Sequence, residues 1–375
     1  AICRIGGNVK RTNLRYVWLV AILLAIITIF TYVRFNSTGH LKNQIYQQWS
    51  KNYVVQQKDK AYVKTTNDKK KDVVLSESQG YGMVTAVEAA KQGYASQKDF
   101  ERLYNYYLAH RMKNTQLMSW RQTVKNGVVT AETNNATDGD LYIAYALIQA
   151  AKLWPQKAAV YNAQAKAILK DILTYNYNST TGVLTVGNWA TSDSKYYRLM
   201  RTSDVLPAQF QAFYKLTGNR QWLNIRSNML SKLEMMSAKT KTGLLPDFLW
   251  VEANTVRAVE KKSVASKYDG DYYYNACRLP YNLAQSQDKQ SQKILDKMMN
   301  FFMKQEILYA GYTLKGKALN NYQSASFGAP IFYAANRNSA YRKLVQQNKY
   351  IFMQDLSKEN YYEAAMITLV ALDAL

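Results

Sequence analysis

The chain has 375 residues with only 5 prolines and 16 glycines, which excludes a disordered or low-complexity protein. This length suffices for one large domain or two ordinary ones. The 49 lysines and arginines exceed the 26 aspartates and glutamates, and the formal net charge is +23. We therefore expect attraction to polyanions such as nucleic acid, acidic lipid or anionic wall polymers.

The first predicted element is an apolar helix. Residues 16–33, "YVWLVAILLAIITIFTYV", lack charge and have about the minimum length that spans a bilayer. Basic residues precede them, so the positive-inside rule places residues 1–15 in the cytoplasm. Because no A-x-A cleavage site follows, we predict an uncleaved transmembrane signal anchor rather than a cleaved signal peptide. Residues 34–40 would be a tether, and residues 41–375 an extracellular domain attached to the cell membrane.

The predicted topology constrains partners and cofactors. An extracellular domain favours acidic lipid or anionic wall polymers over nucleic acid as the target of the basic charge. Cys3 and Cys277 would lie on opposite sides of the membrane, so they would form no disulfide within one chain. With 2 histidines and no cysteine cluster, we expect neither a transition-metal site nor another cofactor. We expect the domain to be monomeric.

Beyond residue 40 the pattern is helical almost to the C-terminus, as in "KDFERLYNYYLAHRM" and "NYYEAAMITLVALDAL". The Lys-rich segment 65–72 is predicted to be a solvated loop. A weak repeat is also present, in which a predicted helix ends, a threonine follows, and a Leu-containing extended segment comes next. The repeated threonines are Thr115, Thr181, Thr242 and Thr313. Their spacing fits one helical hairpin plus loops, which predicts five to six hairpins, stacked or closed into a ring with the loops on one rim.

The segment "LSESQGYGMVTAVEAAKQG", residues 75–93, places Glu77 between two serines and shortly before Gly80 and Gly82. A helix start with Ser76 as its N-cap explains the serines. Two glycines in a helix cost about 1 kcal/mol each relative to alanine, so we expect something to approach this backbone closely. The pattern is not a dinucleotide or phosphate loop.

The segment "NNATDGDLYIAYALIQAAKLW", residues 134–154, carries Asp138 and Asp140 just before a long apolar run. Asp138 could cap the helix, and Asp140 in its first turn would complement the helix dipole. The same pair could instead handle a substrate. This segment alone does not separate the two interpretations.

Both segments resemble glycoside hydrolase family 8. "SESQGYGM" is similar to the family's S-E-G-Q-G-Y-G-M segment, and "ATDGDLYIAYALIQAAKLW" is similar to its A-[ST]-D-[AG]-D signature. Further similar segments are "LMSW", "GNWA", "RTSDVLPAQFQAF", "TGLLPDF" and "YNACRLPYNLA", in family order over about residues 41–375. The resemblance implies an all-α fold, an (α/α)6 barrel of six helical hairpins, and inverting hydrolysis of a β-1,4-linked polysaccharide.

Inverting hydrolysis uses a protonated carboxyl for the leaving oxygen and a second carboxylate, about 6.5–9.5 Å away, that activates water. By resemblance, Glu77 is the general acid and Asp138 holds the distorted sugar, while Asp140 orders the loop. Tyr81 and Met83 would supply semi-apolar surroundings that raise the pKa of the Glu77 carboxyl.

The general base is where the sequence departs from the family. Cellulases of the family have Asp in the Y-D-A-x-R element, but position 275 here is Asn, whose amide cannot accept a proton near neutral pH. A second branch, which includes chitosanases and lichenases, also has Asn there and takes its base from the preceding insert. The insert acids here are Glu252, Glu260, Asp269 and Asp271. We favour Glu260 by its position in the loop, while Asp269 and Asp271 could order the loop or act as the base.

The remaining candidates would bind the glycan. Aromatic side chains stack on sugar rings, and charged groups at a cleft hold hydroxyls or pair with carboxylates. The resemblance and the aromatic content predict the following substrate-binding residues: Tyr81, Trp120, Trp189, Tyr197, the run 272–274, Arg201, Asp204 and Arg278. A buried ion-pair network that holds the loops is the alternative for the charged members.

The sequence therefore predicts a membrane-anchored extracellular endo-β-1,4-glycanase with a polysaccharide substrate. The charge of +23 disfavours polycationic chitosan and favours a β-glucan or an exopolysaccharide. Because Asn275 replaces an acid, the alternative is a catalytically silent glycan-binding module associated with polysaccharide synthesis or export. A purely structural helical ring would leave the acid and glycine motifs unexplained.

Overall fold

A computed structural model describes residues 11–375, with side chains described from residue 16 onward except at 32 and 34–36. Cys3 and most of the predicted cytoplasmic segment 1–15 lie outside the described residues. The chain divides into two compact units, Ala1–Gln44 and Ile45–Leu375.

Helix α1 runs without a break over Arg11–Tyr53, so residues 34–40, predicted as a tether, continue the helix. Its apolar side chains between Tyr16 and Val33 are exposed where they are described. Within the described part of the chain, no helix has the combined length and apolar content needed to cross a bilayer. This corrects the prediction of a transmembrane helix at residues 16–33.

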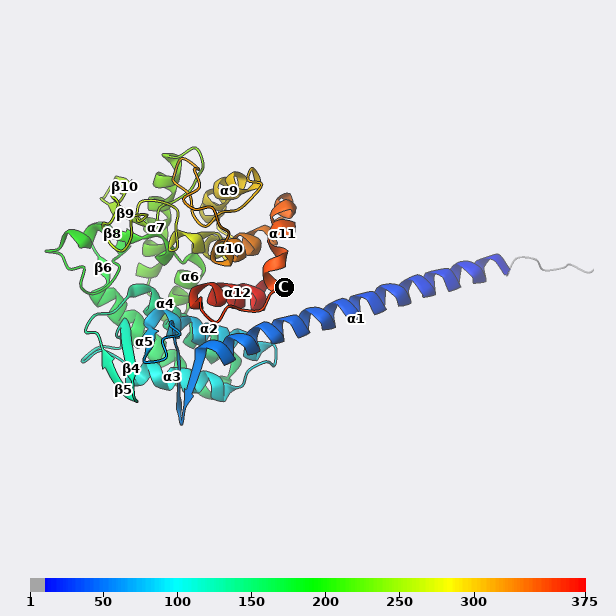
Figure 1. Cartoon of the computed structure of the whole chain (residues 1–375), viewed down its shortest axis with the longest axis horizontal. Coiled ribbons are helices and arrows are strands. Elements are labelled where there is room, and N and C mark those ends of the chain that lie inside the picture. Colours follow the sequence, from blue (N-terminus) through cyan, green and yellow to red (C-terminus); the bar gives the residue numbers. More distant parts are fainter. Residues whose placement is uncertain (1–10) are drawn as a thin grey trace, which may run out of the picture. The chain divides into compact units, whose positions relative to one another are not determined.

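Six helices of the second unit pack side by side in a closed ring (Figure 1). Each contacts the next in the order α2, α4, α6, α8, α10, α12, and α12 returns to α2. Their bounds are Ser76–Lys91, Thr137–Leu153, Pro207–Thr217, Leu279–Ala284, Ala325–Ala335 and Tyr361–Ala374. Small and apolar residues dominate α4, α10 and α12, and these helices are buried on nearly every side because they line the centre of the ring.

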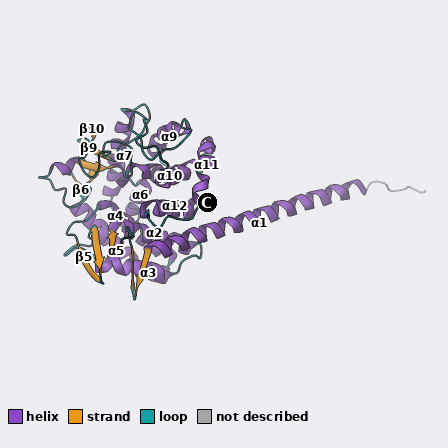
Figure 2. Cartoon of the chain, in the orientation of Figure 1, coloured by secondary structure: helices purple, strands orange, loops and turns teal. Residues whose placement is uncertain are grey.

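A second set of helices packs against this inner ring (Figure 2). Helices α3, α5, α7, α9 and α11 contact α2, α4, α6, α8 and α10 respectively, with bounds Gln97–Ala109, Ala158–Tyr175, Gln221–Ala238, Lys289–Met303 and Arg342–Asn348. Trp49 and Tyr53, at the end of α1, lie against Tyr361 at the start of α12. The predicted all-α (α/α)6 barrel is confirmed.

Short antiparallel strands lie in the connections between helices. The bounds of β1 to β5 are Val54–Gln57, Lys60–Val63, Asp72–Leu75, Arg121–Lys125 and Val128–Ala131. The bounds of β6 to β10 are Tyr177–Asn178, Val183–Leu184, Leu199–Arg201, Phe248–Val251 and Val256–Ala258. The 3-10 helices η1 to η6 span Pro155–Lys157, Lys195–Arg198, Thr202–Asp204, Ala276–Arg278, Ser339–Tyr341 and Lys349–Met353. The predicted Lys-rich loop is irregular from 65 to 71, and Asp72 begins β3.

The threonine repeat marks one structural position in each hairpin. Thr115, Thr181, Thr242 and Thr313 follow the outer helices α3, α5, α7 and α9. Each therefore lies in the connection that leads from an outer helix to the next inner helix. These connections bring the chain back to the N-terminal ends of the inner helices, where the site residues lie.

Two glycines bring α2 and α4 together at that end of the ring. A Cβ at Gly139 would lie 2.2 Å from the Ser76 Oγ, and a Cβ at Gly80 would lie 2.7 Å from the Tyr142 Cβ. At Gly82 the close neighbour is Val63 of β2. The close approach expected from the glycine spacing is therefore made by a helix and a strand, and it places the first turns of α2 and α4 in contact.

Candidate active site

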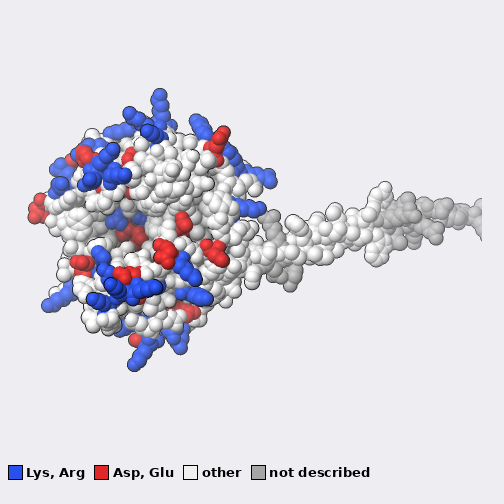
Figure 3. Space-filling view, in the orientation of Figure 1, with Lys and Arg blue, Asp and Glu red and all other residues white. Residues whose placement is uncertain are grey.

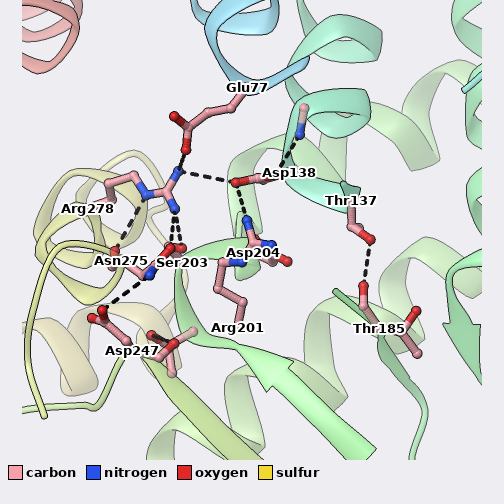
Figure 4. Close-up of polar contacts among 12 residues, drawn as sticks. Glu77, Thr137, Asp138, Thr185, Arg201, Ser203, Asp204, Asp247, Asn275 and Arg278 are labelled. Carbon is pink, nitrogen blue, oxygen red and sulfur yellow. Dashed lines mark hydrogen bonds and ion pairs between the residues drawn. The ribbon is translucent and has the colours of Figure 1, made fainter. Parts of the chain in front are cut away.

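Four charged side chains converge from the N-terminal ends of four inner helices (Figure 4). Glu77 lies in the first turn of α2 and Asp138 in the first turn of α4. Arg201 ends β8, shortly before α6, and Arg278 ends η4, directly before α8. Helix N-termini carry a partial positive charge, which stabilises the two carboxylates there.

Both first-turn acids have roles other than capping. Leu75, not Ser76, is the N-cap of α2, and Ala136 is the N-cap of α4. Among the described backbone groups, the N–H of Gly139 alone donates to the Asp138 carboxylate, at 3.0 Å. The helix-capping interpretation therefore does not explain either acid.

Arg278 is at the centre of the network and is 1 % exposed. Its Nη1 donates to the Glu77 Oε2 at 2.9 Å and to the Tyr81 hydroxyl at 2.7 Å. Its Nη2 donates to the Ser203 hydroxyl at 2.7 Å and to the Asn275 Oδ1 at 3.1 Å. A planar guanidinium can make this set of bonds because its donors have a fixed fork geometry.

The surroundings shift the pKa values of Glu77 and Asp138 in opposite directions. Burial raises the pKa of Glu77, the Arg278 guanidinium lowers it, and the nearby Asp138 charge raises it, with a net rise. Burial also raises the pKa of Asp138, but Arg201 and Arg278 outweigh burial and hold it below its usual value. A carboxyl with a raised pKa beside one with a lowered pKa is the arrangement expected of an acid and its charged partner.

Glu77 also remains accessible, since its side chain is 17 % exposed whereas that of Asp138 is 2 % exposed. Figure 3 shows that one face of the second unit is hollowed near its middle, with acidic and basic atoms at the floor of the hollow. A protonated carboxyl with partial exposure can reach a bound substrate.

Arg201 links Asp138 to a further buried acid, Asp204. Its Nη1 donates to the Asp138 Oδ2, and its Nε lies 3.8 Å from the Asp204 Oδ1. Neither carboxylate oxygen of Asp204 has a hydrogen-bond partner among the described residues, and the side chain is 1 % exposed. Burial raises the pKa of Asp204 to about 7 although Arg201 opposes the rise. Arg201, which is partly exposed, and Asp204, which is buried, thus belong to the ion-pair network, and their role in substrate binding stays a prediction.

Asp140 binds two connecting segments rather than the Arg278 network. Its Oδ1 accepts from the backbone N–H of Met118 and its Oδ2 from the Asn135 amide, both at 2.8 Å. Burial raises its pKa to about 7, and these two bonds oppose the rise. Asp140 holds the connections that precede β4 and α4.

Asn275 is held by an acid that the sequence analysis did not select, Asp247. The Asn275 amide donates to the Asp247 Oδ2 at 3.2 Å, and the backbone N–H groups of Tyr273 and Ala276 donate to its Oδ1 at 3.0 and 2.7 Å. Asp247 is buried, and burial raises its pKa to about 6 against the effect of these bonds. It positions the segment that carries Asn275 and Arg278.

The insert acids Glu252 and Glu260 lie on exposed ion pairs apart from this network. Glu260 is 64 % exposed, pairs with Arg257, and accepts from the Trp250 indole at 2.9 Å. The indole hydrogen bond and the Arg257 contact lower the pKa of Glu260 to about 2. Glu252 pairs with Arg198 at 2.7 Å. No contact joins either acid to Arg278 in the described structure.

The other two insert acids differ in what they bind. Asp269 is buried and accepts from three consecutive backbone N–H groups, those of Val264, Ala265 and Ser266, at 2.7 to 3.0 Å. It therefore orders the loop. Asp271 is half-buried, and burial raises the pKa of its carboxyl. Its backbone carbonyl accepts from the Asp247 N–H at 2.9 Å, which places it beside the segment that holds Asn275.

The predicted aromatic residues differ in how much of each side chain is exposed. Tyr81 is fully buried and supports Arg278 through its hydroxyl, so no sugar can stack on its ring. Trp120 is half-buried, and its carbonyl accepts from the Ser76 N–H, next to Glu77. Trp189 is 38 % exposed. Tyr197 is half-buried and accepts from the Ser179 N–H at 3.3 Å.

The run 272–274 lies beside the Asp247 segment, with Tyr272 buried and the next two tyrosines half-buried. Besides Asp247, the sequence analysis missed Ser203 and Tyr361. The pKa of Tyr361 is raised by burial and by the nearby Glu77 charge. An acid between proline and phenylalanine in "LLPDF" was a usable signal for Asp247, and Ser203 lies within the family-like segment "RTSDVLPAQFQAF", whereas Tyr361 carried no such signal.

Among the described residues, no group of three or more histidines, cysteines, aspartates or glutamates is placed to hold a metal ion. The site offers one partly exposed carboxyl whose pKa is raised, one carboxylate fixed by two guanidiniums, and a surrounding set of polar and aromatic groups.

Comparisons with known proteins agree with this geometry. The profile of the family described as "Glycosyl hydrolases family 8" matches residues 20–374. A beta-glucanase of Niallia circulans is 31 % identical over 301 residues, which cover 77 % of this chain and 73 % of that protein. An endoglucanase of Bacillus sp. (strain KSM-330) is 30 % identical over 312 residues, which cover 79 % of this chain and 65 % of that protein.

The apo structure of a β-1,3-1,4-glucanase from Paenibacillus sp. X4 superimposes with a TM-score of 0.82 at 27 % identity, covering 90 % of this chain and 91 % of that one. Rex8A from Paenibacillus barcinonensis, complexed with xylose, has the same fold at a TM-score of 0.71 and 20 % identity. The family-wide match and the shared barrel lead to one conclusion. The chain belongs to glycosyl hydrolases family 8 and is an endoglucanase-like glycoside hydrolase.

Proposed function

We propose that this chain is an inverting endo-hydrolase of β-1,4 linkages in a β-glucan. The observation that carries the proposal is the state of Glu77: a partly exposed carboxyl whose pKa is raised, beside an ionised Asp138, with Arg278 bound to both. Names of relatives that are beta-glucanases and endoglucanases support the substrate class.

In the proposed reaction Glu77 donates its proton to the oxygen that links two sugars. The bond from that oxygen to the anomeric carbon breaks, and a water oxygen bonds to the same carbon from the opposite face. Asp138, fixed by Arg201 and Arg278, stays ionised and holds the distorted sugar that develops positive charge. Its negative charge also raises the pKa of Glu77, so the acid keeps its proton until the linkage is in place.

The base that removes the proton from the attacking water is proposed to be Asp271. Glu260 was favoured by its place in the insert, but its low pKa and its ion pair with Arg257 make it a weak proton acceptor. Asp269 has its oxygens occupied by backbone N–H groups. Of the four insert acids, Asp271 alone combines partial burial, a raised pKa and a carboxylate to which no described residue donates.

A neutral β-glucan suits the charge of the protein better than chitosan. The formal net charge of +23 repels a polycation over the Debye range, about 8–10 Å at physiological salt, whereas a neutral chain meets no such barrier. An acidic exopolysaccharide would be attracted. The extracellular location stays a prediction.

The test is release of reducing ends from mixed-linkage β-glucan, carboxymethyl cellulose and chitosan by the wild-type protein and by Glu77→Gln. We expect hydrolysis of mixed-linkage glucan by the wild type and a fall in kcat of about 10²- to 10⁴-fold in the variant. Proton NMR of the first products should show the α-anomer, the product of inversion. Equal rates for both proteins would remove Glu77 from the chemistry.

A second outcome would favour the silent glycan-binding module, which Asn275 in the place of an acid suggests. In that case the wild type would release no reducing ends from any of the three polymers, yet would still bind one of them. Binding in gels that contain each polymer, compared with empty gels, separates this outcome from an inactive or misfolded preparation.

A further inference from the structure

A pocket lies between the turn at residues 192–198 and the β9–β10 hairpin, apart from the Arg278 network. Its volume is about 710 Å³, within the range that binds small ligands. Trp250 and the two exposed ion pairs described above, Arg198–Glu252 and Arg257–Glu260, line it. Strands β9 and β10, which contribute lining residues, belong with β8 to one antiparallel sheet (Figure 1).

A line of aromatic rings connects this pocket to the start of α4. The ring of Trp189 lies 5.2 Å from that of Tyr196, and Tyr196 lies 6.2 Å from Trp250, measured between ring centroids. Asn188, next to Trp189, exchanges two hydrogen bonds with Asn135, at 2.8 and 3.1 Å. Since Asn135 lies three residues before Asp138, the line of rings begins beside the active site.

Two of the three rings pack against a small apolar core. Tyr196 and Trp250 pack against a buried cluster made of Val186, Ala190, Leu199, Phe248 and Val259. A fixed, partly exposed aromatic surface binds the C–H faces of sugar rings at little entropic cost. Each step between rings is comparable with the size of one pyranose ring.

The charged groups of the pocket suit hydroxyls. Each of the two arginines is paired with a glutamate, so the pocket offers donors and acceptors in balance. Lys195 lies over the Tyr196 ring, with its Nζ 5.0 Å from the centroid, and Lys239 donates to the Val256 carbonyl. Balanced charges give a polyanion little advantage over a neutral sugar chain.

We propose that this pocket, together with the Trp189–Tyr196–Trp250 line, is a distal subsite that binds the neutral glucan chain several sugars away from the cleaved linkage. Glu260 then acts there as a hydrogen-bonding residue for hydroxyls. The inference rests on the proposed function for its substrate. It gives the insert a role in holding long polymers.

The experiment measures binding and hydrolysis separately. Binding of a mixed-linkage β-glucan polymer is measured by affinity electrophoresis in the Glu77→Gln background, with and without Trp250→Ala or Arg257→Gln. Hydrolysis is measured with the two pocket variants on the polymer and on a cello-oligosaccharide too short to reach the pocket. Arg257→Gln changes only an exposed side chain, so it gives a result even if Trp250→Ala fails to fold.

We expect each pocket variant to weaken polymer binding, about tenfold for Trp250→Ala, and to lower the ratio of kcat/KM on polymer to kcat/KM on the oligosaccharide by a similar factor. Two matched controls should leave both quantities within twofold: Tyr175→Ala, an aromatic residue 45 % exposed, and Glu234→Gln, a member of the exposed pair with Lys293.

Polymer binding and ratios within twofold of the parent in both pocket variants would overturn the inference while leaving the hydrolase function intact. Loss of oligosaccharide hydrolysis in Glu260→Gln with unchanged polymer binding would also overturn it, since Glu260 would then be the base. Conversely, polymer binding that depends on Trp250 in a protein that hydrolyses no glucan would support the subsite and reject the proposed function.

Discussion

Glu77 and Asp138 share one nitrogen atom of Arg278: its Nη1 lies 2.9 Å from the Glu77 Oε2 and 3.6 Å from the Asp138 Oδ2. The shared guanidinium therefore links α2 to α4 through two residues that are 61 positions apart in the sequence. It also makes the protonation states of the two carboxyls depend on each other and on Arg278.

The first prediction concerns that shared cation. Arg278→Met should lower the free energy of unfolding by roughly 3–5 kcal/mol at pH 7, because it leaves buried carboxyls without their partner. The loss should be smaller at pH 5. Arg278 holds the pKa of Asp138 below the ordinary aspartate value, so in the wild type this carboxyl stays ionised at pH 5. In the variant, burial without this cation raises the pKa values of the buried carboxyls, so they take up protons at pH 5 and no longer carry unpaired buried charge.

Urea unfolding at both pH values checks this prediction. Lys293→Met serves as the control, since it breaks an exposed pair with Glu234 that should contribute less than about 1 kcal/mol. An equal, small loss in both variants at both pH values would contradict the central role of Arg278.

A second prediction concerns Asp204, whose folded pKa of about 7 lies above the ordinary value for an aspartate. A group with a raised folded pKa stabilises the folded state below its unfolded pKa, and that stability is lost as pH rises through the folded value. Asp204→Asn mimics the protonated form. The unfolding free energy of the variant minus that of the wild type should therefore be small below about pH 4, should grow by roughly 2–3 kcal/mol between pH 5 and pH 8.5, and should level off above pH 7.

Urea titrations of both proteins across this pH range provide the measurement. Asp68→Asn, in the exposed loop that follows β2, serves as the matched control with the same change of side chain at the surface. A variant of Asp204 that is less stable than the wild type at pH 8.5 would show that the ionised carboxylate strengthens the network through Arg201.

A third prediction concerns the helix contact that brings the two acids together. Gly139→Ala should destabilise the protein by about 1–3 kcal/mol, because its methyl group would overlap Ser76 unless α2 and α4 move apart. The same movement would displace Glu77 relative to Asp138, so kcat should fall as well. Thermal unfolding and initial rates on β-glucan test both effects, and an unchanged kcat in a destabilised variant would separate packing from catalysis.

Sequence patterns predicted the ring of hairpins because its signals are local. Helical periodicity and a threonine that recurs after each outer helix, as at Thr115 and Thr242, depend on neighbouring residues alone. Glu77, Asp138, Arg201 and Arg278 were selected because they lie in segments that resemble the family. The barrel then brings them together because each lies at or just before the N-terminus of an inner helix.

The base and the supporting residues were harder to predict for a physical reason. The path of the insert is set by Asp269, which binds three backbone N–H groups, and no side-chain pattern reveals bonds to the backbone. Position along the loop therefore pointed to Glu260, which the structure places on an exposed ion pair. Asp247 and Ser203 act through contacts with residues 28 and 75 positions away, Asn275 and Arg278.

The last prediction separates the two neighbouring insert acids. Asp271→Asn should lower kcat about 10²- to 10⁴-fold, the usual contribution of a general base, with little change in unfolding free energy because no described residue donates to its carboxylate. Asp269→Asn should instead lower the unfolding free energy by about 1–3 kcal/mol, since it can no longer accept from all three backbone N–H groups.

Added azide tests the role of the base, because azide is a nucleophile that needs no deprotonation. Azide should restore cleavage by Asp271→Asn and give the α-glycosyl azide, the product of inversion. It should not restore cleavage by Asp269→Asn. If azide rescues Glu260→Gln and leaves Asp271→Asn unchanged, the base lies on the exposed pair, and the insert must close over the substrate before the water is activated.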